Sequence, residues 1–403
     1  MTNLPQGWEV KKLGEIGEIV TGSTPSKSNL DFYGKDYPFF KPSDFEQGYF
    51  LENAGDNLSK LGFGKARQLP PKTILVVCIG SLGKVALTKV IGSCNQQINA
   101  IIPHKNIISE YIYYYCISSK FQSILFSKAP QTTLAILNKT EFSKLEIIYP
   151  KDIKEQERIV GILDFAFSKI DENIKKAKEN LANIDELMQS ALQKAFNPLN
   201  DNTKENYQLP QSWEWKSLGD TSNYGKTSQV KPSQLKGNDW ILELEDIEKE
   251  SGVLLQKVLF QDRQSKSNKI KFNKGDILFG TLRPYLKKVI IADDNGACSS
   301  EIMPFSTGNS ITNHFIYYYL FANFLHDRIS SLTYGARMPR LGTKDGKSLQ
   351  IPLPPLQEQE QIAEHLDFVF EKAKALKELY TKELKDYEEL KQSLLDKAFK
   401  GEL

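Results

Sequence analysis

Polar stretches that combine Arg, Lys, Gln or Thr with Gly or Pro, and that hold few acids, are the parts of this sequence best suited to binding chemistry. They lie at 80–84, 128–139, 280–288 and 334–344. Guanidinium and ammonium groups bind phosphate oxygens, while Arg, Gln and Thr also hydrogen-bond base edges. The pattern predicts nucleic-acid contacts from Lys84, Gln131, Thr133, Lys139, Arg283, Lys287, Arg337, Arg340 and Lys344. The alternative for each is a solvated surface charge or a turn residue.

Motifs that carry catalytic chemistry are missing from the sequence. Gly80–Lys84 has the wrong spacing for a phosphate-binding loop, and no GxGxxG, HExxH or GxSxG pattern occurs. We find neither a glycine-rich S-adenosylmethionine turn nor an [ND]PP[YF] tetrapeptide. The 4 cysteines form no CxxC pair and there are only 4 histidines, so we expect no metal site. Carboxylates beside lysines are too common in a charged chain to indicate a nuclease.

An internal repeat with a period of about 204 residues positions these stretches. Leu4–Glu9 (LPQGWE) returns as Leu209–Glu214 (LPQSWE), and Cys94 aligns with Cys298. The large segments between such landmarks differ much more. Because 204 residues is far longer than a solenoid repeat, the pattern indicates a duplicated unit of one globular domain followed by one helix.

The most similar parts of the repeat are two long amphipathic segments. Residues 155–197 and 358–400 are identical at 18 of 43 positions without a gap. Their apolar residues recur at steps of three and four, which predicts two long helices that pair along one seam. Separate packing of each helix on its own domain is the alternative. The residues expected in the core of the helix pair are Leu163, Leu187, Leu366 and Leu390.

The charge follows the same division. Residues 1–152 and 201–355 carry formal net charges of +4 and +3, whereas 153–200 and 356–403 carry −1 and −4. A basic balance in both large segments fits binding to nucleic acid, although a solvated surface can also be basic. The strand pattern at 72–80 and 274–280, with helical spacing at 109–126 and 313–329, makes the large segments mixed α and β. We therefore predict an α+β protein of two globular domains separated by two helices.

The order of these motifs resembles the specificity (S) subunit of type I restriction-modification systems. The resemblance covers essentially the whole chain and includes Ile351–Gln359 (IPLPPLQEQ) and Leu394–Leu403 (LLDKAFKGEL). The first copy departs from it, because its junction at Ile147–Gln156 (IIYPKDIKEQ) lacks the double proline. This difference affects the expected shape of that junction.

The resemblance implies target recognition domains at 1–152 and 201–355, each reading one half of a bipartite site in double-stranded DNA. It implies that the helices at 153–200 and 356–403 form an antiparallel coiled coil with internal pseudo-two-fold symmetry. That coiled coil would space the domains and dock two methyltransferase (M) subunits, with restriction (R) subunits added. The positions expected in the helix pair or at partner contacts are Gln156, Leu163, Phe167, Leu187, Gln359, Leu366, Phe370 and Leu390.

The resemblance also implies that this chain performs no catalysis. S-adenosylmethionine, ATP and Mg²⁺ would belong to the partner subunits, and this chain would hold no cofactor or metal. Since no apolar run approaches the length of a membrane helix and the N-terminus does not resemble a signal peptide, we expect a cytoplasmic protein. Two alternatives remain: a coiled-coil adaptor without DNA specificity, and a self-contained methyltransferase or nuclease with a degenerate site.

Overall fold

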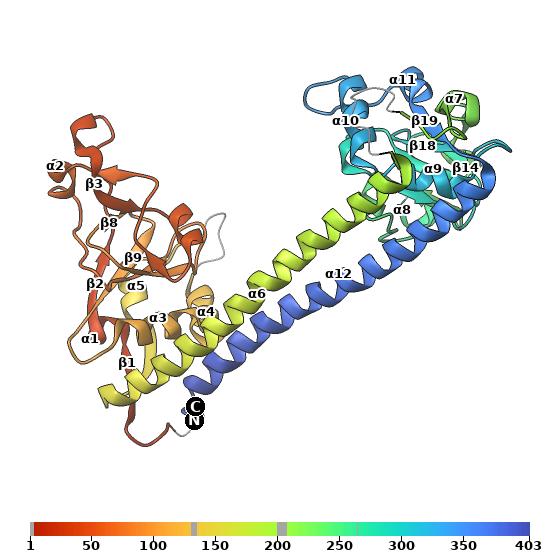
Figure 1. Ribbon diagram of the computed structural model, residues 1–403. Coiled ribbons are helices and arrows are strands. Elements are labelled where there is room, and N and C mark those ends of the chain that lie inside the picture. The colour runs from red at the N-terminus through yellow and green to blue at the C-terminus, as the bar shows by residue number, and fades with distance from the viewer. Residues whose placement is uncertain (1–3, 130–134, 200–207, 264) are drawn as a thin grey trace. The chain divides into compact units, whose positions relative to one another are not determined.

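The computed structural model describes residues 4–129, 135–199, 208–263 and 265–403. The chain divides into two compact units (Figure 1). Unit 1 comprises Met1–Ala177 with Glu383–Leu403, and unit 2 comprises Lys178–Lys382. Both boundaries fall inside the two long helices, α6 (Ile153–Phe196) and α12 (Leu356–Ala398). Each unit therefore contains one globular domain and parts of both helices.

The globular part of unit 1 is built from short strands and helices. Its strands are β1 (Trp8–Lys12), β2 (Gly17–Thr21), β3 (Tyr33–Phe40), β4 (Phe50–Leu51), β5 (Asn57–Leu58), β6 (Ile74–Val77), β7 (Val85–Thr88), β8 (Ser93–Cys94), β9 (Ile98–Pro103) and β10 (Glu146–Pro150). Its helices are α1 (Leu13–Ile16), α2 (Lys60–Phe63), α3 (Ser109–Ile117), α4 (Ser119–Lys128) and α5 (Lys139–Ser143). The largest sheet has the order β2-β9-β6-β7-β4.

Unit 2 repeats this plan. Its strands are β11 (Glu214–Ser217), β12 (Ser228–Val230), β13 (Trp240–Leu242), β14 (Lys269–Phe272), β15 (Ile277–Gly280), β16 (Val289–Ile291), β17 (Gly296–Cys298), β18 (Ile302–Phe305) and β19 (Gln350–Leu353). Its helices are α7 (Leu218–Thr221), α8 (Phe260–Arg263), α9 (Asn313–Tyr319), α10 (Asn323–Leu332) and α11 (Thr343–Ser348). The sheets have the orders β16-β15-β18, β12-β14-β17-β13 and β11-β19.

The strands predicted at 72–80 and 274–280 are β6 and β15, and each lies in the middle of its sheet. All four residues of each strand are buried, which explains why their sequences, ILVV and ILFG, are continuously apolar. The helical segments at 109–126 and 313–329 each form two helices. The first breaks at Ser118, whose hydroxyl caps α4 by accepting a hydrogen bond from the N–H of Phe121.

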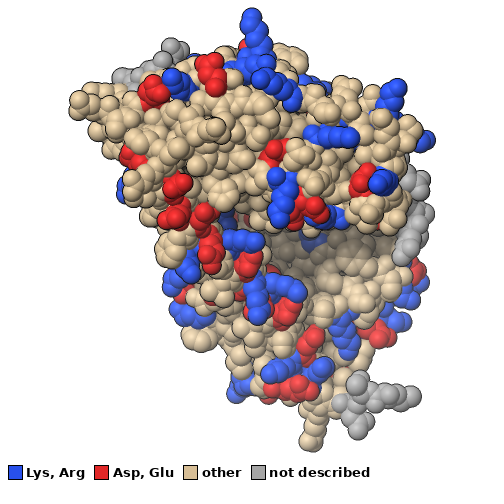
Figure 2. Space-filling view, turned by 90° about the vertical axis from the view of Figure 1, so that its right-hand side faces the viewer, with Lys and Arg blue, Asp and Glu red and all other residues tan. Residues whose placement is uncertain are grey.

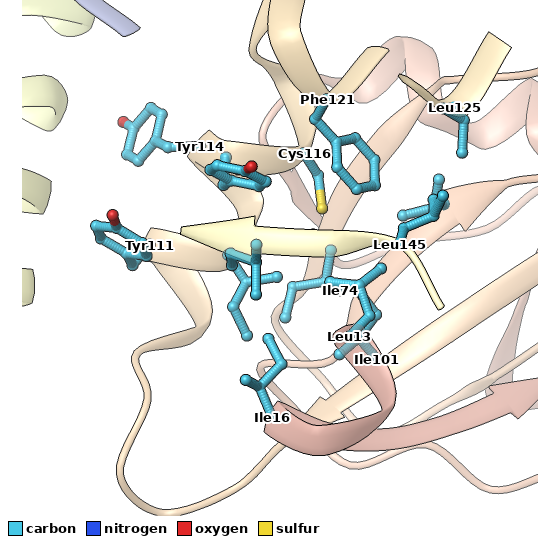
Figure 3. Packing of buried hydrophobic residues seen from close by; sticks show 14 of the residues in the cluster. Leu13, Ile16, Ile74, Ile101, Tyr111, Tyr114, Cys116, Phe121, Leu125 and Leu145 are labelled. Carbon is cyan, nitrogen blue, oxygen red and sulfur yellow. The ribbon is translucent and has the colours of Figure 1, made fainter. Parts of the chain in front are cut away.

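Each domain has a core that includes residues of the long helices. The core of unit 1 joins α3, α4 and the central sheet to Leu163 of α6 and to Leu395, Ala398 and Phe399. Figure 3 shows part of it, with Leu13, Ile16, Ile74, Ile101, Tyr111, Tyr114, Cys116, Phe121, Leu125 and Leu145 packed together. The core of unit 2 takes in Leu366 of α12 and Leu192 and Phe196 at the end of α6.

The two long helices run antiparallel within each unit. In unit 1, Lys391 lies 2.6 Å from Asp171, and Arg158 donates a 2.7 Å hydrogen bond to the carbonyl of Leu403. In unit 2, Ile184 and Met188 of α6 pack with Ala373 of α12. The pairing predicted from the three-and-four spacing is therefore present, although its contacts differ from the expected ones.

The prediction that four leucines form the core of the helix pair is wrong for two of them. Leu187 and Leu390 are 59% and 46% exposed, so neither lies in the core of the helix pair. From Met188 onward the buried residues of α6 advance by four, through Leu192 to Phe196, because the helix end turns its apolar side toward the domain core. The buried Leu163 and Leu366 likewise belong to the domain cores.

Candidate nucleic-acid interface

Two of the predicted basic stretches meet in unit 2. The loop after β15 and the hairpin before α11 are separated by about fifty residues, yet the N–H of Arg283 donates to the carbonyl of Pro339 at 2.7 Å. The N–H of Leu341 donates to the carbonyl of Thr281 at 2.9 Å. Backbone bonds of 2.9 and 3.2 Å between Tyr334 and Arg340 close the hairpin. The fold thus brings Arg283 and Arg340 to one place.

A third segment, which sequence reasoning missed, completes the site. Glu301 accepts two hydrogen bonds from Thr281 through its carbonyl, at 2.8 Å from the N–H and 3.0 Å from the hydroxyl. Its carboxylate lies 3.6 Å from the guanidinium of Arg340, and both side chains are about one-third exposed. The sequence signal was present, since Glu301 follows Cys298, a landmark of the repeat, by three residues.

A hollow of about 560 Å³ opens beside these segments. The residues that line it are Glu243, Leu244, Glu245, Arg263, Ser265, Leu282, Arg283, Leu286, Lys288, Glu301 and Met338. The lining therefore offers both hydrogen-bond donors and carboxylate acceptors. Figure 2, which shows one face of the molecule, likewise has Lys and Arg side chains interspersed with Asp and Glu.

Several charges of the hollow are held by partners inside the domain. Arg263 makes bonds of 2.6 and 2.8 Å to the two carboxylate oxygens of the buried Asp246. Burial alone would raise the pKa of Asp246, but these bonds keep it below its ordinary value. Glu243 is 2.6 Å from the ammonium of Lys269, and Lys288 donates a 2.7 Å bond to the carbonyl of Leu244. These groups form the walls of the hollow.

Lys287, although predicted as a DNA contact, points into the domain. Its ammonium donates to the carbonyl of Phe321 at 3.0 Å and to the side-chain oxygen of Asn323, and the residue is only 6% exposed. Burial lowers the pKa of this ammonium. A group held in this way cannot reach a phosphate, so we remove Lys287 from the candidate interface.

Unit 1 builds the same backbone arrangement. The N–H of Cys78 donates to the carbonyl of Gln97 at 2.8 Å, and the N–H of Leu137 donates to the carbonyl of Cys78 at 2.9 Å. The N–H of Gly80 donates to the carbonyl of Ala135 at 3.3 Å. Both units therefore bring together three segments: the loop after their central strand, the turn after the repeated cysteine, and residues 135–137 in unit 1 or 339–341 in unit 2.

The remaining predicted contacts lie in several places. Arg337 and Lys344 are exposed on or beside the hairpin of unit 2, and Lys139 is exposed at the first residue of α5. Lys84 pairs with Glu46, and this ammonium holds the pKa of the Glu46 carboxyl below its usual value. Gln131 and Thr133 lie outside the described residues.

The predicted partner contacts include two glutamines that lock the domains to their helices. Gln156, fully buried, accepts a 2.9 Å bond from the N–H of Ile108 and donates a 2.9 Å bond to the carbonyl of Pro150. Gln359, also fully buried, accepts a 3.0 Å bond from the N–H of Thr312. It donates bonds of 2.8 and 3.0 Å to the carbonyls of Pro354 and Ser310. We therefore assign both glutamines to the internal joints.

The predicted Phe167 and Phe370 pack on corresponding tyrosines of the two units, Tyr114 and Tyr318. Phe167 meets Tyr114 edge-on at a centroid distance of 5.3 Å, and Phe370 meets Tyr318 at 5.0 Å. Other apolar residues of the helices remain open to solvent. Phe165 is 69% exposed, and Phe368, its counterpart in the repeat, is 60% exposed.

Features that could support other chemistry are few among the described residues. Groups of three or more His, Cys, Asp or Glu arranged to hold a metal do not occur there. Burial raises the pKa values of Cys78 and Cys94 to about 12, so neither thiol supplies a nucleophile at neutral pH. Within the same residues, every helix is too short or too polar to cross a membrane.

Comparison with known proteins identifies relatives along the whole chain. The model of a family described as "Type I restriction modification DNA specificity domain" matches residues 5–183 and 210–385. The type I restriction enzyme HindI specificity subunit of Haemophilus influenzae is 39% identical over 176 residues. This match spans 42% of the present chain and 38% of that subunit. The EcoDI specificity subunit of Escherichia coli is 23% identical over 99% of this chain and 89% of its own length.

Solved structures show the same fold. A chain from a study of complex assembly and conformational transition of the type I R-M system superposes with a TM-score of 0.78, at 20% identity. The match covers 100% of both chains. The HsdS subunit from Thermoanaerobacter tengcongensis gives a TM-score of 0.55, also at 20% identity, over 100% of this chain and 98% of that one.

Proposed function

Because the chain belongs to the family of type I restriction-modification DNA specificity domains, we propose that it is the subunit that selects the DNA target in such a system. The observation that carries this proposal is the duplicated arrangement of three loop segments. Each unit assembles it with the same backbone hydrogen bonds and with different side chains. Two domains of one design with different contact residues fit a target whose two halves differ in sequence.

The electrostatics support DNA as the ligand of the globular parts. Their net charges of +4 and +3 favour the phosphate backbone, whereas the helical segments, at −1 and −4, do not. Arg337 and Lys344 are exposed and suit phosphate contacts, which position a protein on DNA. The hollow between the loops, with its mixture of donors and carboxylates, suits base edges, which specify the sequence.

The long helices dock the methyltransferase subunits in this proposal. Large apolar side chains are exposed at corresponding positions of the two helices, and we assign these repeated pairs to the docking surfaces. Phe165 and Phe368 are one pair, and Leu187 and Leu390 are the other. Since each unit presents one member of each pair, the duplication supports two methyltransferase subunits for each copy of this chain. Restriction subunits would join that assembly.

Catalysis then resides in the partners. S-adenosylmethionine would be held by the methyltransferase subunits, and ATP and Mg²⁺ by the restriction subunits. This chain would supply recognition alone and act in the cytoplasm, where the DNA is. The sequence motifs discussed above give it no catalytic constellation of its own.

The decisive experiment maps modified bases by long-read sequencing in cells that express this chain with its neighbouring methyltransferase subunit. Matched cells lack only this chain. We expect a split motif of two unlike halves with methyladenine, lost when the chain is absent. Replacing residues 201–355 with those of a relative should change only one half. An unchanged methylation pattern, with both proteins soluble and associated, would favour an adaptor, and S-adenosylmethionine-dependent activity of the chain alone would favour an enzyme.

A further inference from the structure

Arg283, Glu301 and Arg340 of unit 2 form a base-contacting site, and we propose that they select a G·C base pair in the half-site read by that unit. The inference rests on the proposed function, since it names the residues through which unit 2 would discriminate bases. The evidence for it is a comparison of the two units, in which the loop residues correspond one by one through their backbone hydrogen bonds.

The backbone correspondence between the units is complete for three hydrogen bonds. Cys78 corresponds to Thr281: each donates its N–H to the turn after the repeated cysteine at 2.8 Å and accepts a 2.9 Å bond from a leucine N–H. The turn residues are Gln97 and Glu301, and the leucines are Leu137 and Leu341.

The third bond pairs Gly80 with Arg283. Their N–H groups donate to the carbonyls of Ala135 and Pro339 at 3.3 and 2.7 Å. Isolated bridges complete the match, since Ile79 pairs with Ile136 as Leu282 pairs with Arg340. Gly80, Gln97 and Ile136 in unit 1 therefore occupy the positions of Arg283, Glu301 and Arg340 in unit 2.

At these three positions the two units share a backbone arrangement but differ in their side chains. Unit 1 has a glycine, an amide and an aliphatic residue, whereas unit 2 has two guanidinium groups and a carboxylate. Arginine is less favourable than glycine at position 283, because the backbone there is left-handed, with φ +49°. The corresponding Gly80 has φ +81°. Unit 2 therefore places an arginine at a position whose backbone conformation favours glycine.

The three charged groups are also the ones that the domain leaves least engaged. The guanidinium of Arg340 and the carboxylate of Glu301 are 3.6 Å apart, which is too long for a hydrogen bond. The Nε of Arg283 is buried and has no hydrogen-bond partner among the described residues. Arg283 and Glu301 line the hollow, and the other charged groups that line it, apart from the exposed Glu245, bond to neighbours inside the domain.

The chemistry of these groups points to one base pair. A guanidinium can donate two parallel hydrogen bonds to O6 and N7 of guanine, and a carboxylate can accept one from N4 of cytosine. A carboxylate also repels phosphate, so Glu301 is unsuited to the DNA backbone and suited to a base edge. Arginine beside an acid therefore matches a G·C pair better than it matches a phosphate or an A·T pair.

The test replaces each residue with the one that unit 1 carries at the same position, which this backbone already accommodates. The variants are Arg283→Gly, Glu301→Gln and Arg340→Ile, each measured in the full chain with its methyltransferase subunit. The readouts are the methylated motif and the affinity for duplexes in which each base pair of the two half-sites is changed in turn. Arg337→Ala, on the same hairpin and exposed, is the matched control.

We expect the three variants to lose about 5- to 150-fold of the preference for G·C at one position of the second half-site. Recognition of the first half-site should be unchanged, and unchanged recognition of the other base pairs of the second half-site reports that unit 2 is folded. Glu301→Gln is the mildest change and should relax one base pair only. Arg337→Ala should weaken all sequences about equally.

The inference is overturned if the wild-type chain reads a split motif and the variants read the same one. It is also overturned if they lose affinity for all sequences equally, as phosphate contacts would. If the wild-type chain itself shows no sequence preference, the proposed function fails first and the inference falls with it.

Discussion

Replacing Gln359 with leucine should selectively destabilise unit 2. The buried amide satisfies the N–H of Thr312 at the start of α9 and two carbonyls, those of Ser310 and Pro354. Leucine has a similar volume and no polar atom, so the substitution removes the hydrogen-bond partner of each group. A buried group without a partner costs about 1–3 kcal/mol. Because Ser310 is exposed and water can reach its carbonyl, whereas Pro354 is buried, we expect a net loss of about 3 kcal/mol.

Differential scanning calorimetry measures this loss. For a unit of this size, about 3 kcal/mol corresponds to a melting temperature lower by about 6–12 °C. Gln357→Leu makes the same chemical change at an exposed position of the same helix and is the control. Gln156→Leu should produce the corresponding loss in unit 1. If Gln359→Leu melts within about 2 °C of the control, the three hydrogen bonds do not stabilise the joint and the reasoning fails.

Three further outcomes are expected. Arg283→Gly should leave the melting temperature of unit 2 unchanged or slightly raised, because relief of about 1–2 kcal/mol of left-handed strain exceeds the backbone entropy cost of glycine, about 0.5–1 kcal/mol; a fall of several degrees would refute this. Burial lowers the pKa of His326 to about 4, so between pH 6.5 and 4 the unfolded chain binds a proton on this residue and the folded chain does not. The free energy of unfolding should therefore decrease by up to about 3 kcal/mol over this range, as measured by chemical unfolding. His326→Gln should make this decrease smaller. Arg337→Ala should lower the slope of log affinity for DNA against log salt concentration by about 1, measured by titration at several salt concentrations.

The duplication, the central strands and the long helices could be predicted because they depend on local patterns. The continuous apolar runs of β6 and β15 and the three-and-four spacing of α6 are properties of neighbouring residues. The exposure of Leu187 could not be predicted in this way. An apolar stripe does not say which neighbour covers it, and at the end of α6 the domain core covers a different side of the helix.

The candidate site was predictable in part. Residue type was enough to select Arg283 and Arg340 as candidates. It could not show that hydrogen bonds to Pro339 and Thr281 bring their loops together. Glu301 was missed because a search for basic stretches discards acids. Lys287 was included because sequence cannot distinguish an exposed ammonium from one that is buried against a helix end.

The pairing of the first and last strands of each globular part has a consequence for how such chains change over time. Glu214 of β11 lies opposite Leu353 of β19, and Trp8 of β1 lies opposite Pro150 of β10. Paired residues of antiparallel strands have Cα atoms about 5 Å apart. Each globular part therefore begins and ends at nearly the same point next to the helices. Its length and contents can be exchanged by recombination at two neighbouring points, while the joints to the helices keep their geometry.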